Sequence, residues 1–108
     1  MEERRRFPRY DCAFEVRYSP QGDAKENYTV SKNVSRGGIR LPVSRIVKNG
    51  DTLKLDIDIN QKRGRVFAIG KVRWLKEISR PSPLGLDAGL EFTKIDSLDV
   101  ERLVETVY

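Results

Sequence analysis

Three stretches of the chain alternate apolar and polar residues, and this pattern constrains the fold more than any other feature. They span residues 12–18, 53–59 and 86–92. Successive side chains of a β-strand point to opposite faces, so a repeat of two gives each stretch one apolar and one polar face. Each stretch therefore predicts an amphipathic strand that packs against a core on one side of a sheet.

Further strands are predicted between these stretches. Residues 28–34 form one, and a short strand over 39–41 ends at Pro42. A long strand over 65–76 has apolar residues at both even and odd positions, so its facing stays open. Gly70 inside this strand indicates a bulge or a bend. The strands are separated by turn-forming segments, at 20–27, Asn49-Gly50-Asp51 and 60–64.

The repeat changes at the end of the chain, where apolar residues are spaced i, i+3, i+4 and i+7. This spacing places them on one stripe of a helix. Asp96 or Ser97 can cap its first turn, because either side-chain oxygen accepts from a backbone N–H that has no partner within the helix. The stripe consists of Val100, Leu103, Val104 and Val107.

About six short antiparallel strands followed by one helix suggest an all-β fold, a small closed barrel, since closure removes exposed strand edges. The 108 residues fit one domain. We expect that domain to comprise a flexible arginine-rich arm at 1–9, a barrel at 10–93 and the helix at 96–107.

Composition restricts the chemistry of the chain. It has no histidine and one cysteine, Cys12, so it lacks the commonest general base and cannot form an internal disulfide or a cysteine zinc site. Asp56 and Asp58 fit the polar face of a strand better than a catalytic pair. We therefore expect no enzyme activity, no metal and no cofactor. Cysteine usage and the absence of a secretory or membrane-spanning segment predict a cytoplasmic protein without membrane insertion.

Basic residues concentrate at the N-terminus of a chain whose net charge is +5. Arg4, Arg5 and Arg9 belong to this cluster, which by itself is also typical of a solvated terminus. Pro8 favours an extended backbone before it, and in an extended segment Arg5 and Arg9 share one side, about 13 Å apart. Guanidinium groups bind phosphate in a bidentate manner and stack on bases, so the cluster fits an anionic nucleotide.

A second polar cluster begins at Asn33. On a strand, Asn33 and Ser35 share a face while Val34 points into the interior. An amide and a hydroxyl match the donors and acceptors of a guanine edge, and Gly37 and Gly38 permit positive φ and a close approach by a ligand. The same residue types also occur in ordinary strand connections, so the cluster alone leaves both interpretations open.

Together, the two clusters resemble the PilZ domain, a bacterial receptor module for cyclic di-GMP. The family's R-x-x-x-R motif is matched by Arg5 and Arg9, and its [D/N]-x-S-x-x-G motif by Asn33, Ser35 and Gly38. The resemblance covers essentially the whole chain and implies a six-stranded antiparallel β-barrel with a C-terminal α-helix. It continues downstream in Gly50-Asp51, Val72-Arg73-Trp74 and Ala88-Gly89-Leu90-Glu91-Phe92.

The resemblance also implies a role for each residue. Arg5 and Arg9 would hold phosphate and stack on guanine, while Asn33 and Ser35 would bind the edge of the other guanine and Gly38 would keep the turn open. Asn33 replaces the alternative aspartate of the motif, which predicts a modest loss of affinity. A basic residue at the position of Arg4 accompanies an intercalated pair of ligand molecules in relatives. Arg36 and Gly37 are secondary candidates for the site.

The predicted function is therefore second-messenger signalling: cyclic di-GMP orders the N-terminal arm and changes the surface shown to a protein partner. Two alternatives remain. The chain could be a PilZ-like adaptor that works without nucleotide, or a small basic barrel that binds nucleic acid. The second requires aromatic residues beside basic ones on an exposed strand face, whereas the aromatic residues here mostly fall on apolar faces, so we expect no nucleic-acid partner. The sequence identifies neither the protein partner nor the oligomeric state, and a homodimer stays open.

Overall fold

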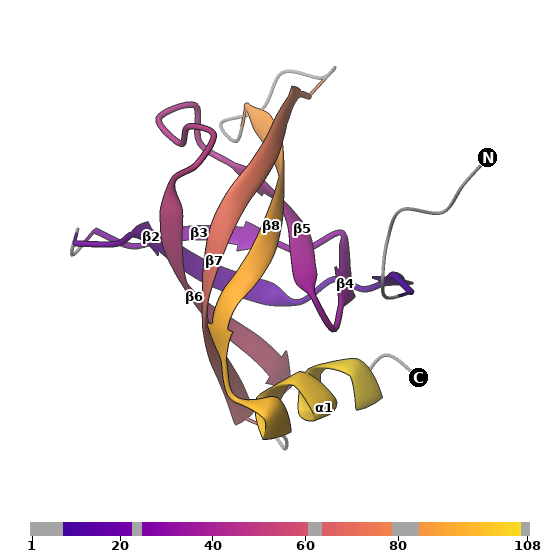
Figure 1. Ribbon diagram of the computed structural model, residues 1–108. Helices are drawn as coiled ribbons and strands as arrows, with labels where there is room; N and C mark the ends of the chain where they lie inside the picture. The colour runs from indigo at the N-terminus through magenta and orange to yellow at the C-terminus, as the bar shows by residue number, and fades with distance from the viewer. Residues whose placement is uncertain (1–7, 23–24, 61–63, 79–84, 107–108) are drawn as a thin grey trace.

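The computed structural model describes residues 8–22, 25–60, 64–78 and 85–106, and it is almost entirely β-structure with one helix (Figure 1). Its elements, in chain order, are β1 Tyr10–Asp11, β2 Glu15–Pro20, β3 Asn27–Val30, β4 Asn33–Ser35, β5 Gly38–Val43, β6 Thr52–Asn60, β7 Gly64–Glu77, β8 Leu86–Ile95 and α1 Ser97–Glu105.

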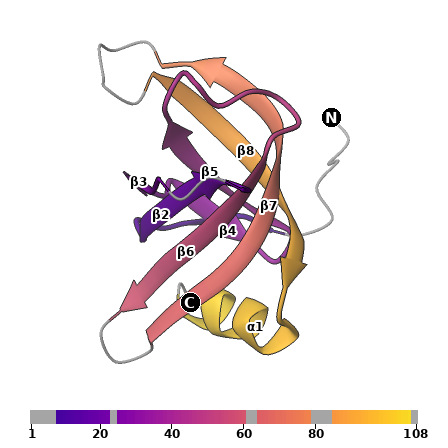
Figure 2. The ribbon, with the colours of Figure 1, turned by 90° about the vertical axis from the view of Figure 1, so that its left-hand side faces the viewer.

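The strands form one curled antiparallel sheet in the order β1-β4-β5-β8-β7-β6-β2-β3 (Figure 2). The strands β1 and β3 lie at the two edges of the sheet. Along the chain, β1 continues into β2 and β3 continues into β4. The segments β1 and β2 therefore act as one bent strand, and β3 and β4 as another. The sheet thus has eight strands where the sequence predicts six, because two of the predicted strands are bent and divided, and chain continuity joins its two ends.

The bend in these two strands explains why the predicted strand over 28–34 appears as β3 and β4. Between the pairs Asp11–Asn33 and Glu15–Val30, three residues of one strand face two of the other. Ser31, which is buried, fills the interruption. Its hydroxyl accepts from the backbone N–H of Phe14 at 2.9 Å and donates to the carbonyl of Cys12 at 3.0 Å. Two backbone bonds, from Cys12 to Lys32 and from Ser31 to Phe14, also cross the interruption, so the serine side chain supplements the ladder there.

The predicted alternation places the core correctly. The apolar residues of the three alternating stretches face inward, and the side chains of β6 are buried at every second position. The first of these stretches becomes a regular strand only from Glu15, and β5 runs through Pro42 to Val43 instead of ending at the proline. The core side chains of these stretches include Phe14, Val16, Tyr18, Leu53, Leu55, Ile57, Ile59, Ala88 and Leu90.

The mixed parity of the long strand, β7, has two causes: Phe67 is apolar but exposed, and the pairing with β8 is irregular. The register shifts between Ile69 and Gly70, as expected for a bulge near this glycine, and again between Val72 and Trp74. Val72 points inward before the second shift, whereas Leu75 packs against the core after it. One extra residue, Arg73, has changed which positions face the interior.

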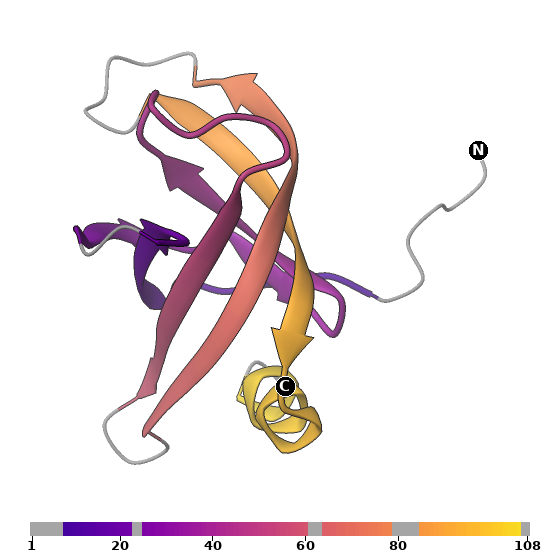
Figure 3. The same cartoon turned by 60° about the vertical axis from the view of Figure 1, so that its left-hand side comes forward.

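Helix α1 lies across one end of the sheet (Figures 1 and 3). The carboxylate of Asp96 accepts from the backbone N–H of Leu98 at 2.8 Å, so Asp96 is the N-cap. Leu103 and Val104 are buried from the predicted stripe, and Val107 lies outside the described residues. Among the described residues, no helix is long and apolar enough to cross a membrane.

Candidate ligand-binding site

The polar motif lies on the hairpin of β4 and β5. Asn33 pairs with Arg40, Val34 with Ile39 and Ser35 with Gly38, which leaves Arg36 and Gly37 as the turn. Val34 is fully buried in the core. Asn33 and Ser35 therefore share the outer face of the sheet, as the sequence predicts.

Backbone and side-chain bonds fix the tip of this hairpin. The Ser35 hydroxyl accepts from the backbone N–H of Gly37 at 3.2 Å, and the carbonyl of Gly37 accepts from the backbone N–H of Phe92 at 2.9 Å. Ser35 is buried, and its oxygen already stabilises the turn that follows it. The motif serine thus has a local structural role before any ligand is considered.

Gly38, the glycine of the motif, serves a different purpose from the one that the sequence suggests. Neither Gly37 nor Gly38 has positive φ. A Cβ at Gly38 would overlap the backbone oxygen of Leu90 on β8, because β5 and β8 approach each other closely at that point. Strand packing, and not conformational freedom, requires glycine at position 38.

The two sequence motifs meet at one hydrogen bond. Arg9, immediately before β1, donates from Nη1 to the Asn33 side-chain oxygen at 2.8 Å. The pairing of β1 with β4, Tyr10 with Val34 and Asp11 with Asn33, brings the end of the arginine cluster to the polar hairpin. The predicted ligand contacts of Arg4 and Arg5 lie outside the described residues.

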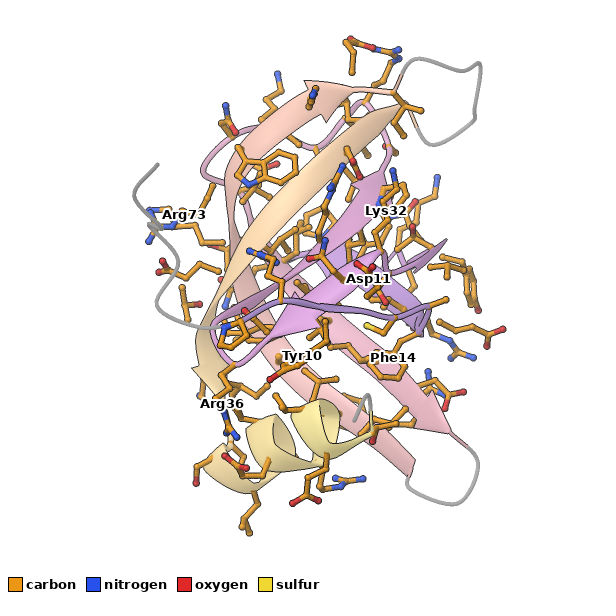
Figure 4. All side chains as sticks on the ribbon, turned by 90° about the vertical axis from the view of Figure 1, so that its right-hand side faces the viewer. Tyr10, Asp11, Phe14, Lys32, Arg36 and Arg73 are labelled. Carbon is orange, nitrogen blue, oxygen red and sulfur yellow. The ribbon has the colours of Figure 1, made fainter. Side chains whose placement is uncertain are left out.

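Arg36 points toward the helix (Figure 4). Its guanidinium forms an ion pair with Glu101 of α1, and both side chains are substantially exposed. Exposed pairs of this kind contribute about 0–1 kcal/mol to stability. Arg36 thus links the hairpin tip to the helix in this structure.

Sequence reasoning missed Arg40, the cross-strand neighbour of Asn33 on the same outer face. Its guanidinium bonds to Asp87 and lies 5.6 Å from the centre of the Trp74 ring. The signal was present in the sequence, because a two-residue turn at 36–37 sets position 40 opposite position 33. Predicting Asp87 as a neighbour would have required the pairing of β5 with β8, and predicting Trp74 also the pairing of β8 with β7.

Beyond Gly38, the outer face continues to an ion pair. Glu91 pairs with Gly38 across the sheet and accepts from Arg73 at 2.7 Å. This hydrogen bond and the positive charge of Arg73 lower the pKa of the Glu91 carboxyl. Glu91 therefore remains ionised at neutral pH and balances the charge of Arg73 next to the hairpin.

Comparison with known families matches the PilZ domain over residues 3–108. The chain belongs to the PilZ domain family. No curated protein sequence matches it significantly.

Solved structures share the fold at low sequence identity. The Bacillus subtilis inhibitor of motility, MotI/DgrA, is 23% identical with a TM-score of 0.77, and the alignment covers 98% of this chain and 50% of that one. The PilZ domain of Escherichia coli YcgR with c-di-GMP is 12% identical with a TM-score of 0.76, covering 97% and 89%. The MrkH–c-di-GMP complex of K. pneumonia is 17% identical with a TM-score of 0.72, covering 97% and 51%. The chain thus spans about half the length of MotI/DgrA and MrkH.

Proposed function

We propose that the chain is a receptor domain for cyclic di-GMP. The observation that carries the proposal is the hydrogen bond from Arg9 to Asn33, because it joins the R-x-x-x-R and [D/N]-x-S-x-x-G motifs on one outer face. The family match and the c-di-GMP named with two of the similar structures support the same ligand. In this role the chain acts by binding and catalyses no reaction.

In the proposed complex, Arg5 and Arg9 hold the phosphates and stack on guanine, while Asn33 and Ser35 bind the edge of the other guanine. The Asn33 oxygen accepts from Arg9 in the structure, so the ligand either exchanges this bond or uses the amide N–H donors of Asn33. Micromolar binding requires about 8 kcal/mol, which a few charge-assisted hydrogen bonds of about 1.5–3 kcal/mol each, with stacking, can supply.

Ligand binding would also order the arm over residues 1–9 and change the surface that a protein partner meets. Arg4 would neutralise the additional phosphates if two intercalated ligand molecules bind. Amide exchange tests the ordering step: backbone amides of residues 4–9, apart from Pro8, should gain protection when cyclic di-GMP is added. Equal protection with and without ligand would contradict a moving arm.

Calorimetric titration tests ligand identity. The wild-type chain should bind cyclic di-GMP with a Kd in the micromolar range or below, and Arg9→Ala should weaken binding by about 10- to 100-fold, the loss expected for a charged contact. Arg45→Ala is the matched control, because Arg45 is exposed and pairs with Glu77 instead of facing the hairpin. If both variants bind alike, Arg9 has no role in the site.

Nucleic acid is a second candidate because three aromatic residues are exposed, although the other described ones are buried or partly buried as expected. Tyr28, Phe67 and Trp74 are exposed, and the Arg17 guanidinium lies 5.2 Å from the Tyr28 ring centre. Exposed rings next to arginine can stack on single-stranded bases. Titration with a single-stranded oligonucleotide at several salt concentrations distinguishes the candidates. Binding that weakens steeply with salt, without a response to cyclic di-GMP, favours nucleic acid.

A further inference from the structure

The outer face of β6 and β7 carries two neighbouring apolar side chains in polar surroundings (Figure 2). Phe67 is 64% exposed, and Ile69, two positions further along β7, is partly exposed on the same face. The residues opposite them on β6 are Asp56 and Lys54. Isolated exposed apolar residues need no explanation, but contiguous apolar surface indicates an interaction site.

A groove lies beside these two side chains and crosses three strands. Besides the Phe67 ring, its apolar lining comes from Leu55 on β6, from Ala68 and Ile69 on β7 and from Ile95 on β8. Leu55 pairs with Ala68, and Ala68 with Ile95, so the groove runs straight across the sheet. It can therefore take an apolar side chain of a partner out of water.

Two lysines flank this groove. Lys54 from β6 and Lys94 from β8 both pair with Ile69, one on each side of it. Both lysines are exposed, and neither has an ion-pair partner within the part of the chain that the structure describes. The nearby carboxylate of Asp56, by contrast, already pairs with Arg65. The two uncompensated positive charges favour a partner with carboxylates.

The spacing of the lysines defines the partner further. Neighbouring strands lie about 4.8 Å apart, so the backbones of Lys54 and Lys94 are about 10 Å apart with Ile69 between them. On an α-helix, residues i and i+7 share a face about 10.5 Å apart, and i+3 and i+4 lie between them. A helix with carboxylates at i and i+7 and apolar side chains at i+3 and i+4 therefore matches the groove in charge and in polarity.

Nucleic acid fits this groove less well. Asp56 pairs directly with Phe67 across the sheet, and Asp96 also lines the groove. Both carboxylates repel a phosphate backbone. The groove also contains a single aromatic ring, whereas proteins that bind single strands stack successive bases on several rings.

We propose that this groove, formed by β6, β7 and β8 around Phe67, docks an acidic amphipathic helix of a protein partner. It lies apart from the candidate ligand site. The hairpin glycine Gly38 pairs with Glu91, and Glu91 with Lys71, from which Phe67 is four residues, or about 13 Å, further along β7. The inference extends the proposed receptor function to its protein partner, while docking at the groove itself requires no nucleotide.

Peptide selection tests the groove with a defined probe. The probe is a phage-displayed library of alanine-based peptides of about 20 residues, long enough to populate a helix in water, randomised at i, i+3, i+4 and i+7. Selection on the wild-type chain, with counter-selection on Phe67→Thr, should enrich carboxylates at i and i+7 and apolar residues at i+3 and i+4. No enrichment, or enrichment of a different pattern, overturns the proposal.

Calorimetry with a synthetic enriched peptide then tests the individual side chains. Phe67→Thr should weaken binding by about tenfold or more, the loss expected for an anchor residue, and Tyr28→Thr is the matched control because Tyr28 is an equally exposed ring on β3. Lys94→Glu should weaken binding to a similar extent, and a peptide with lysine at the facing acidic position should restore it. Lys76→Glu, at the other end of β7, is the charge control. Equal affinity of the wild type, Phe67→Thr and Lys94→Glu would overturn the proposal.

Three further measurements separate this surface from other uses of the same face. Phe67→Thr should keep wild-type affinity for cyclic di-GMP, and weaker binding would place Phe67 in the nucleotide site and overturn a separate docking surface. Oligonucleotide binding that is lost in Phe67→Thr would assign the groove to nucleic acid, and self-association in sedimentation that is lost in this variant would assign it to a second copy; either result overturns the proposal. Peptide binding by a chain that does not bind cyclic di-GMP supports the docking surface and overturns only the receptor function.

Discussion

Replacing Gly38 with alanine should destabilise the fold strongly, because β5 and β8 have no room for a side chain at this position. The added Cβ would overlap the Leu90 carbonyl oxygen, which belongs to the backbone of a central strand and cannot rotate away. The strands β5 and β8 pair at six consecutive positions from Gly38 to Val43. They would have to separate at the Gly38 end of this ladder. Overpacking of this kind costs about 1–3 kcal/mol and more where backbone must move.

Thermal unfolding followed by circular dichroism measures this cost. For a domain of this size, 3 kcal/mol corresponds to a decrease of about 10–20 °C in Tm. Gly22→Ala is the comparison, because an added Cβ at Gly22 has no heavy atom within 4 Å while its φ of +93° carries the backbone strain alone. That variant should lose about 1–2 kcal/mol. A Gly38→Ala Tm within two degrees of wild type would refute the close-packing explanation for this motif glycine.

Other parts of the structure give further predictions. Asn33→Asp should tighten cyclic di-GMP binding by a few-fold in calorimetry, since a carboxylate offers two acceptor oxygens where the amide offers one. Weaker binding would show that the ligand uses the amide N–H donors of Asn33. Asp96→Ala should lower the unfolding free energy by about 1 kcal/mol in urea titration, because the N-cap bond to Leu98 is lost, and an unchanged midpoint would argue against this cap. Burial raises the pKa of the Cys12 thiol, so less thiolate exists at a given pH in the folded chain. Alkylation by iodoacetamide should therefore have a higher pH midpoint in the native than in the urea-unfolded protein. Equal midpoints would contradict this.

The sequence predicted the facing of the strands because alternation follows directly from strand geometry. Asn33 and Ser35 appear on one outer face, and Val34 in the core, as that geometry requires. The sequence predicted six strands where the structure has eight, because it did not show that two of them are bent and divided. The bend itself was not predictable, since it depends on the buried Ser31 hydroxyl, which looks like any other polar residue in the sequence.

Long-range pairing limited the prediction of the site. The motif resemblance assigned Arg9 and Asn33 to one site without predicting a direct contact between them, and the neighbouring Arg40, Asp87 and Trp74 come from β5, β8 and β7. A register shift between Val72 and Trp74 alters which residues of β7 face outward, and no local pattern marks it. The reason for glycine at position 38 could not be predicted either, because it is a contact with β8, a strand about fifty residues away in the chain.

A crystal structure of the complex with cyclic di-GMP tests the central claim most directly. Our account predicts a guanine edge against Asn33 and Ser35, with the guanidinium groups of Arg5 and Arg9 in contact with the same ligand. Ligand bound on another face, or bound at the hairpin with both arginines remote from it, would contradict the account.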